Sequence, residues 1–321
     1  MIARTRITRT STKTARAPFR RTGTLRSYWK YRNLTLMLLP GIVYYFVFHY
    51  VPIYGVIIAF KDYSFSAGIW GSRWVGLEHF RLLLSRDSFW EVFRNTVVIN
   101  GLKLIFGFPA PIVLAILLNE VRTAFFKRFV QTVSYLPHFL SWVILSGILI
   151  EFLSPSTGPV NIILQALGMK PIYFLADVNW FRSVLVTSDI WKDLGWGTIV
   201  YLAALTGVSP ELHDAARVDG ANRYHRMRYI TLPSLIPVIT IMLIFAVGKL
   251  VNDDFDQVFN LYNPSVYSVG DVISTYTYRS GLVQMEYSFA TAVGLFKNVL
   301  ALVLVLSANA IAKRINEYGL W

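Results

Sequence analysis

Long apolar runs separated by polar segments dominate the pattern of this sequence. Residues 34–60 form an uncharged run of 27 residues, longer than the roughly 20 that a helix needs to cross a hydrocarbon core. Comparable runs at about 95–118, 129–152, 182–206, 233–250 and 288–312 predict further membrane helices. The pattern therefore predicts an all-α integral membrane protein with six transmembrane helices.

The polar segment 209–233 predicts a short helix, a turn and a second helix. Ser209 is a favoured cap, and Pro210 suits the first helical position. Gly220 tolerates the left-handed conformation that ends many helices, and a second helical run is expected from Asn222. One face of the first helix carries residues spaced i, i+3, i+4 and i+7, namely Leu212, Ala215, Ala216 and Asp219.

Three other connections between the membrane helices are expected on the side of the membrane opposite to the segment 209–233. Residues 61–93 contain several tryptophans, which favour the membrane interface. Residues 153–181 are rich in proline and glycine and predict a short helix near 160–167, while 251–282 is rich in Asp, Asn and Tyr.

Composition supports a membrane protein. Apolar residues make up 55% of the chain and charged residues 15%, against about 45–50% and about 25% in soluble domains. Cysteine is absent, which excludes disulfides, thiolate zinc sites and thiol nucleophiles.

The net charge of +13 is concentrated in an N-terminal tail. Residues 1–33 hold ten basic residues and no acid, which leaves +3 for the rest, so the charge does not indicate nucleic-acid binding. Basic residues mark the cytoplasmic side of a membrane protein. The tail, the loop after residue 118, the segment 209–233 and the C-terminus hold 19 of them, and the three other connections hold seven. Both termini are therefore predicted to be cytoplasmic, with a mitochondrial transit peptide as the alternative interpretation of the tail.

Motifs for catalysis and for phosphate or metal binding are absent. The chain has no G-x-x-x-x-G-K-[ST] phosphate loop, no H-E-x-x-H pair and no G-x-S-x-G elbow. A calcium loop at 252–256 would lack its turn glycine and its distal glutamate. We therefore expect a non-catalytic chain with no bound metal or cofactor.

Two other functions remain open. An intramembrane enzyme could use the acids Glu151, Asp189 and Asp193. An ion-coupled secondary transporter would be expected to show inverted repeats, and no convincing internal repeat is found. Asp189, Lys192 and Asp193 are spaced to pair with one another on one helix face, which predicts a structural network.

The sequence DAARVDGA at 214–221, followed by ITLP at 230–233, resembles the EAA loop of binding-protein-dependent ABC importer permeases of the maltose-transporter-like sugar group. The resemblance implies a type I ABC importer permease fold in which this loop is a cytoplasmic coupling helix docked on an ATPase. The implied ATPase-coupling residues are Glu211, Asp214, Ala215, Ala216, Asp219, Gly220 and Ala221. Asp214 stands where the family usually has Glu, which keeps the charge and shortens the reach.

The same resemblance implies partners and location. It predicts a second, homologous permease as a heterodimer partner, two cytoplasmic ATPase subunits that bind ATP and Mg, and a periplasmic substrate-binding protein in a bacterial inner membrane. Residues 1–33 are then a basic tail and 34–321 the permease domain.

The cargo follows from further matches. WVGLEHFRLLLSRDSFWEVFRNT at 74–96 and YLPHF at 135–139 also resemble the family, and the segment 251–282 resembles its polysaccharide-type branch. The chain as a whole is similar to permease subunits of bacterial alginate importers. This implies an acidic, alginate-like oligosaccharide, with a neutral oligosaccharide as the alternative.

Candidate residues of the substrate path are polar or aromatic groups in or beside the membrane runs. Cations within a membrane run are costly in lipid, so they are expected to face protein or water, and tyrosines can stack on sugars. The candidates are Lys103, Lys249, Asn252, Asp253, Tyr262, Tyr267 and Lys297. A structural ion pair or interfacial packing is the alternative role for each.

Overall fold

The computed structural model describes residues 31–316 and residue 319, in two compact units divided between Gly55 and Val56. The predicted tail lies outside the described residues except for its last three. The first unit is helical, with α2 (Arg32–Tyr45), the π-helical segment η1 (Phe46–Tyr50) and α3 (Val51–Ile53). The 3-10 segment η2 (Tyr54–Phe60) starts in this unit and ends in the second.

The second unit is almost entirely helical, which confirms the predicted all-α class. A two-stranded antiparallel ribbon is its only sheet among the described residues, with β1 (Lys61–Asp62) paired to β2 (Arg73–Trp74) so that Lys61 lies opposite Trp74. Its helices are α4 (Gly68–Gly71), α5 (Glu78–Ser85), α6 (Asp87–Leu102), η3 (Lys103–Gly107), α7 (Pro109–Glu120), α8 (Ala124–Tyr135), η4 (Leu136–Phe139), α9 (Trp142–Phe152), α10 (Pro159–Ala166), α11 (Phe181–Thr206), α12 (Pro210–Val218), α13 (Arg223–Arg226), η5 (Met227–Thr231), α14 (Leu232–Gly248), η6 (Lys249–Val251), α15 (Phe255–Leu261), η7 (Pro264–Val266), α16 (Tyr267–Gly270), α17 (Ile273–Tyr278), η8 (Arg279–Val283) and α18 (Tyr287–Asn316).

Four helices of the described residues are long and apolar enough to cross a membrane, namely Arg32–Phe60, Asp87–Glu120, Arg223–Val251 and Tyr287–Ile315. A fifth is counted if the pair Ala124–Phe139 and Trp142–Phe152 forms one span broken by a bend of 105°. Helix α11 has 26 residues but carries Arg182 and the three charged residues of the predicted network. These segments coincide with the predicted runs, and the count of six remains a prediction.

The third predicted span is bent because its sequence interrupts the helix. The helix continues through Pro137 to Phe139, and the chain leaves it at Leu140 and Ser141, whose backbone is extended. Ser141 then starts α9, where its hydroxyl accepts a hydrogen bond from the Ile144 N–H at 3.4 Å.

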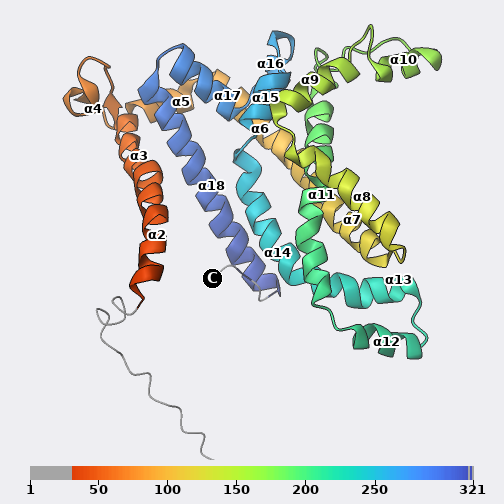
Figure 1. Ribbon diagram of the computed structural model, residues 1–321. Helices are drawn as coiled ribbons and strands as arrows, with labels where there is room; N and C mark the ends of the chain where they lie inside the picture. Colours follow the sequence, from red (N-terminus) through yellow and green to blue (C-terminus); the bar gives the residue numbers. More distant parts are fainter. Residues whose placement is uncertain (1–30, 317–318, 320–321) are drawn as a thin grey trace, which may run out of the picture. The chain divides into compact units, whose positions relative to one another are not determined.

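Three apolar clusters hold the second unit together. One joins α5, α6, α17 and α18, and a second joins α6 and α11 to α15 and its neighbours. The third joins α7, α11 and α14 around Ile112, Tyr201 and Leu235. Helix α11 therefore packs along the helix of residues 87–120 at both ends. In Figure 1, α12 and α13 lie at one end of this unit, and α5, α10 and α16 lie at the other.

Helix α11 approaches α8 closely at Gly195. A Cβ at this position would overlap the main-chain carbonyl of Ser134 and the ring of Tyr135. Glycine is required here because only its missing side chain allows the close approach.

We predict that Gly195→Ala destabilises the protein by about 1–3 kcal/mol, the usual cost of overpacking, and lowers the unfolding temperature of the detergent-purified chain. The control is Gly294→Ala in α18, where a Cβ would meet no atom within 4 Å. An equal loss of stability in the two variants would contradict the close packing of α8 and α11.

Candidate functional site

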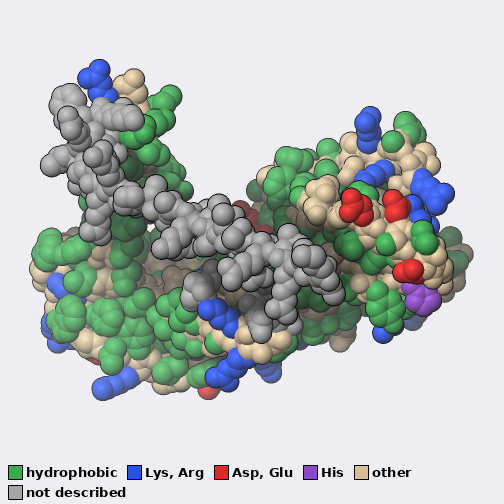
Figure 2. All heavy atoms as spheres, turned by 90° about the horizontal axis from the view of Figure 1, so that it is seen from below, with side chains coloured by type: hydrophobic (Ala, Val, Ile, Leu, Met, Phe, Trp, Pro, Cys, Tyr) green, Lys and Arg blue, Asp and Glu red, His purple; other side chains and the backbone are tan. Residues whose placement is uncertain are grey.

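The first candidate site is the segment 209–233, which we call the coupling segment. Figure 2 views the end of the molecule that carries α12 and α13 and shows charged side chains gathered on that part. No residue of α12 is buried. Leu212 is 54% exposed and Val218 88% exposed, so apolar side chains of this helix are left uncovered.

Helix α12 begins as the sequence predicts. Ser209 is the cap, and its hydroxyl accepts a hydrogen bond from the Glu211 N–H at 3.3 Å. Pro210 occupies the first position, and Glu211 places a negative charge in the first turn, where the helix dipole favours it. Asp214 forms an ion pair with Arg217 at 2.8 Å on the exposed surface.

The end of α12 explains the DGA sequence. Gly220 has a φ of +79°, its N–H donates to the Arg217 carbonyl at 3.1 Å, and the Ala221 N–H donates to the Ala216 carbonyl at 2.8 Å. These two bonds form a Schellman motif, which needs a left-handed residue. Asp219 is the cap residue before the glycine. The predicted stop at Gly220 is therefore confirmed.

The second helix of the coupling segment is longer than the sequence indicates. Asn222 caps it by accepting from the His225 N–H at 2.9 Å. The helix then runs without interruption over Arg223–Val251, whereas the predicted span starts near Pro233. Proline cannot donate a hydrogen bond to the preceding turn, and the π-helical segment η5 directly before α14 accommodates it.

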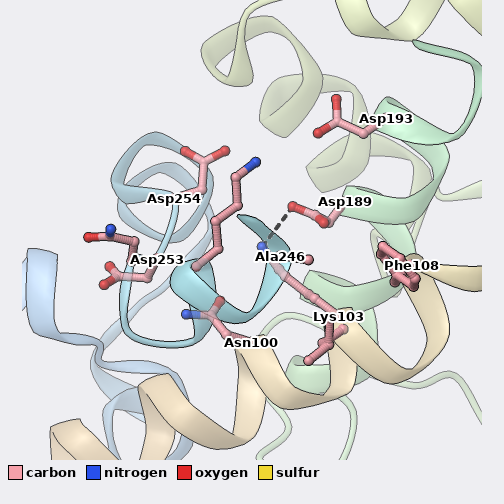
Figure 3. A pocket seen from close by; sticks show the side chains of 11 residues that line it. Asn100, Lys103, Phe108, Asp189, Asp193, Ala246, Asp253 and Asp254 are labelled. Atoms are coloured by element: carbon pink, nitrogen blue, oxygen red, sulfur yellow. Dashed lines mark hydrogen bonds and ion pairs between the residues drawn. The ribbon is translucent and has the colours of Figure 1, made fainter. Parts of the chain in front are cut away.

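The second candidate site is a polar cavity of about 400 Å³. Its walls come from α6, η3, α11, α14, η6 and the residues that lead into α15. Figure 3 shows Asp189 and Asp193 on one side of the cavity and Asp253 and Asp254 on the other. Four of the seven candidate path residues line it, namely Lys103, Lys249, Asn252 and Asp253.

Lys103 is held by groups from two other helices. Its ammonium donates to the Asp189 carboxylate at 2.7 Å and to the Gln257 side-chain oxygen at 2.5 Å. Gln257 is fully buried, and its amide donates to the Leu185 carbonyl at 2.7 Å and the Ser188 hydroxyl at 2.9 Å. Of the two roles expected for Lys103, substrate contact or a structural ion pair, the structure shows the ion pair.

The predicted pairing of Asp189, Lys192 and Asp193 with one another is not observed. Asp189 pairs with Lys103, Asp193 pairs with His138 at 2.9 Å, and Lys192 donates to the His138 carbonyl at 3.0 Å. A side chain on a helix face can bond to a neighbouring segment as easily as to another residue of its own helix. Here the partners are Lys103 and His138, which belong to neighbouring segments.

The other acids of the cavity are also hydrogen-bonded. Asp254 accepts from the Trp142 indole N–H, and Asp253 accepts from the Ser274 hydroxyl and from its main-chain N–H. Lys249 differs, because no acid of the described residues lies within 4.0 Å of its ammonium. The described residues contain no group of three or more His, Cys, Asp or Glu arranged to hold a metal ion.

The remaining path candidates lie outside this cavity. Tyr262 and Tyr267 contact each other, with ring centroids 5.0 Å apart, and the Arg279 guanidinium lies 5.4 Å from the Tyr267 ring. Burial raises the pKa of Tyr262 to about 12, so it stays a neutral donor at any physiological pH. Lys297 lines a separate cavity of about 540 Å³ that also contains Tyr278 and Tyr287.

Sequence reasoning missed Asp254, which lines the cavity, and it missed Gln257 and Trp142, which bond to residues of the cavity wall. Gln257 and Trp142 carry no charge, so nothing in the apolar pattern distinguishes them. Asp254 precedes a helix start, where it reads as a cap, and it does cap α15 by accepting from the Gln257 N–H at 3.4 Å.

We predict that Lys103→Met destabilises the protein by about 3–5 kcal/mol, the usual cost of removing one partner of a buried pair, because the side chains of Lys103 and Asp189 are 13% and 24% exposed. Lys103→Met combined with Asp189→Leu should recover most of the loss, since no charge is then left unpaired. The measurement is thermal unfolding in detergent.

The matched control is Asp193→Asn, whose carboxylate is 60% exposed and whose pair is worth about 0–1 kcal/mol. If Lys103→Met were no more harmful than this control, the pair would not hold the helices together.

Comparisons with known proteins agree with this architecture. Residues 107–317 match the family described as binding-protein-dependent transport system inner membrane component. Protein LplB of Bacillus subtilis (strain 168) is 45% identical over 296 residues, 92% of each chain. The polygalacturonan/rhamnogalacturonan transport system permease protein YteP of the same strain is 44% identical over 290 residues, 90% of each chain.

A solved structure is similar as well. It is a crystal structure of a bacterial alginate ABC transporter in complex with an alginate pentasaccharide-bound periplasmic protein. One of its chains matches with a TM-score of 0.85 and 41% identity, covering 92% of this chain and 99% of that one.

Proposed function

This chain belongs to the family of binding-protein-dependent transport system inner membrane components, and we propose on that premise that it is the permease subunit of an ATP-driven importer for acidic oligosaccharides. The observation that carries the proposal is the exposed helix α12, capped at both ends and joined by Gly220 to a membrane-length helix. Such a rigid, uncovered helix fits a docking role on a separate protein.

The partner on α12 is a cytoplasmic ATPase. Residues Glu211, Asp214, Ala215, Ala216, Asp219, Gly220 and Ala221 form or end this helix and are the coupling residues. The small side chains allow close approach, and the exposed Asp214 offers a charge for contact. ATP and Mg are bound by the ATPase subunits, and this chain binds no cofactor and has no catalytic role.

The rest of the machine comprises a second, homologous permease and a periplasmic binding protein, because one chain offers one coupling segment. The related alginate transporter has been solved with a sugar-loaded periplasmic protein, which supports the latter partner. The distribution of basic residues supports cytoplasmic termini in a bacterial inner membrane.

The proposed cargo is an acidic chain, which is supported by the similar transporter that imports the acidic polysaccharide alginate and by the similarity to the polygalacturonan/rhamnogalacturonan permease. Lys249 is the cavity cation with no acid of the described residues as its partner, and it is the candidate for a substrate carboxylate. Reconstitution with a second permease, the ATPases and the binding protein tests the function. Transport driven by an ion gradient in the chain alone would overturn it.

We predict that Gly220→Val uncouples ATP hydrolysis from transport without unfolding the membrane helices. A branched residue at a φ of +79° costs about 1–3 kcal/mol in backbone strain, and no neighbouring atom within 4 Å would be displaced. Gly220→Asn is the control, because asparagine tolerates this conformation. Full substrate-stimulated hydrolysis and transport in Gly220→Val would contradict the assignment of the coupling segment.

We predict that Lys249→Gln weakens stimulation of ATP hydrolysis by acidic oligosaccharides about tenfold at low substrate, the scale of one charged hydrogen bond, and leaves any response to neutral chains unchanged. Lys249→Arg keeps the charge and serves as the control. Stimulation by neutral chains alone, unaffected by Lys249→Gln, would instead support the neutral-oligosaccharide alternative.

A further inference from the structure

The coupling segment is linked to the cavity helix by one charged contact. Arg223, the first residue of the helix Arg223–Val251, donates through Nε to the Glu120 carboxylate at 2.6 Å. Its Nη2 donates to the main-chain carbonyl of the same residue at 2.8 Å. Glu120 is the last residue of the helix Asp87–Glu120. The two helices are therefore joined end to end.

Neither charge is placed to stabilise its own helix. Glu120 is an anion at a helix C-terminus and Arg223 is a cation at a helix N-terminus, and the helix dipole disfavours both positions. Together the two side chains cancel these charges, and Arg223 also satisfies a carbonyl that the end of α7 leaves without a helical partner. The positions of Glu120 and Arg223 therefore serve to link the two helices, because neither charge stabilises its own helix.

Among the described residues, no hydrogen bond joins α12 itself to α7. A cavity of about 650 Å³ separates them, with Asn119, Val121 and Leu205 on one wall and Pro210 and His213 on another. Because α12 has no buried residue, apolar packing does not hold it against the rest of the second unit. Among the described residues, the two bonds from Arg223 are the hydrogen bonds that join the coupling segment to α7.

The helix that ends at Glu120 also carries Lys103. At 1.5 Å per residue, about 25 Å of helix separates the two positions, and Lys103 holds Asp189 and Gln257 at the cavity. A displacement of the coupling segment at Glu120 therefore acts on the same continuous helix that carries Lys103 at the cavity wall. Coupling between two sites requires such an element, one whose position both sites bias.

We propose that Arg223 and Glu120 form a strut that transmits the movement of the coupling segment to the cavity helix, so that both are positioning residues for transport. This inference rests on the proposed function. Glu120 is the more informative position, because its side chain is 19% exposed against 63% for Arg223, and it is not part of the exposed face of α12.

The test measures sugar transported per ATP hydrolysed in proteoliposomes that contain the complete transporter and its binding protein. Glu120→Arg and Arg223→Glu should each lower this ratio about fivefold or more, the lower range of typical coupling effects. The combined Glu120→Arg, Arg223→Glu exchange restores the attraction and should return the ratio to near the wild-type value. Arg128→Gln is the matched control, since this arginine of α8 is exposed and lies outside the coupling segment.

Rescue by the exchange separates a link from a merely structural role, and co-purification of the ATPase should be unchanged in Glu120→Gln. Single reversals that keep the wild-type ratio would overturn the strut, and so would loss of the ATPase from Glu120→Gln. If the wild-type transporter carried no oligosaccharide, the proposed function would be overturned instead. Wild-type transport is therefore measured before any variant is compared.

Discussion

The need to pair charges inside an apolar helical bundle organises the centre of this protein. An unpaired ammonium in a membrane segment is costly, and Lys103 meets this requirement with Asp189 from α11 and Gln257 from α15. The pairing fixes the helix of residues 87–120 against α11 and brings the loop before α15 beside them. The polar cavity is the space that these side chains enclose. A buried ion pair adds little net stability, so its main effect here is on which helices meet and in what register.

The coupling segment depends on a different kind of interaction, since the shape of α12 is set by local hydrogen bonds while none of its residues is buried. Its stability comes from local hydrogen bonds: the Ser209 cap, the two Schellman bonds around Gly220 and the Asn222 cap. Local bonds keep their geometry when a partner docks or leaves, whereas a helix held by apolar packing would have to give up contacts to move. An exposed element that must transmit a displacement is therefore better built from caps than from a core.

These two kinds of interaction also explain how much could be predicted from the sequence. Caps and turns are set by neighbouring residues, so Ser209, Pro210 and Gly220 were sufficient to predict α12 and its end. The partners of Asp189, Lys192 and Asp193 were predicted wrongly because they come from residues such as Lys103 and His138, more than 50 positions away. The sequence predicted only that certain polar residues would avoid lipid. It did not predict that four of them, Lys103, Lys249, Asn252 and Asp253, would line one cavity. Gln257 and Glu120 gave no local signal of their long-range roles.

The electrostatic character of the cavity depends on which groups are already engaged. Counting ionised side chains gives two lysines against four aspartates, which would repel an acidic sugar. Each of the four aspartates, however, already accepts from a donor of the protein: Lys103, His138, Trp142 or Ser274. One oxygen of Asp253 is buried and so is out of reach of a ligand. A hydrogen bond from a neutral donor such as Trp142 or Ser274 nevertheless leaves the negative charge of a carboxylate in place, so the cavity keeps its formal excess of acids. Lys249 is distinguished by its position instead, since no acid of the described residues lies within 4.0 Å of its ammonium, and a carboxylate bound there would supply the ion pair that the protein does not.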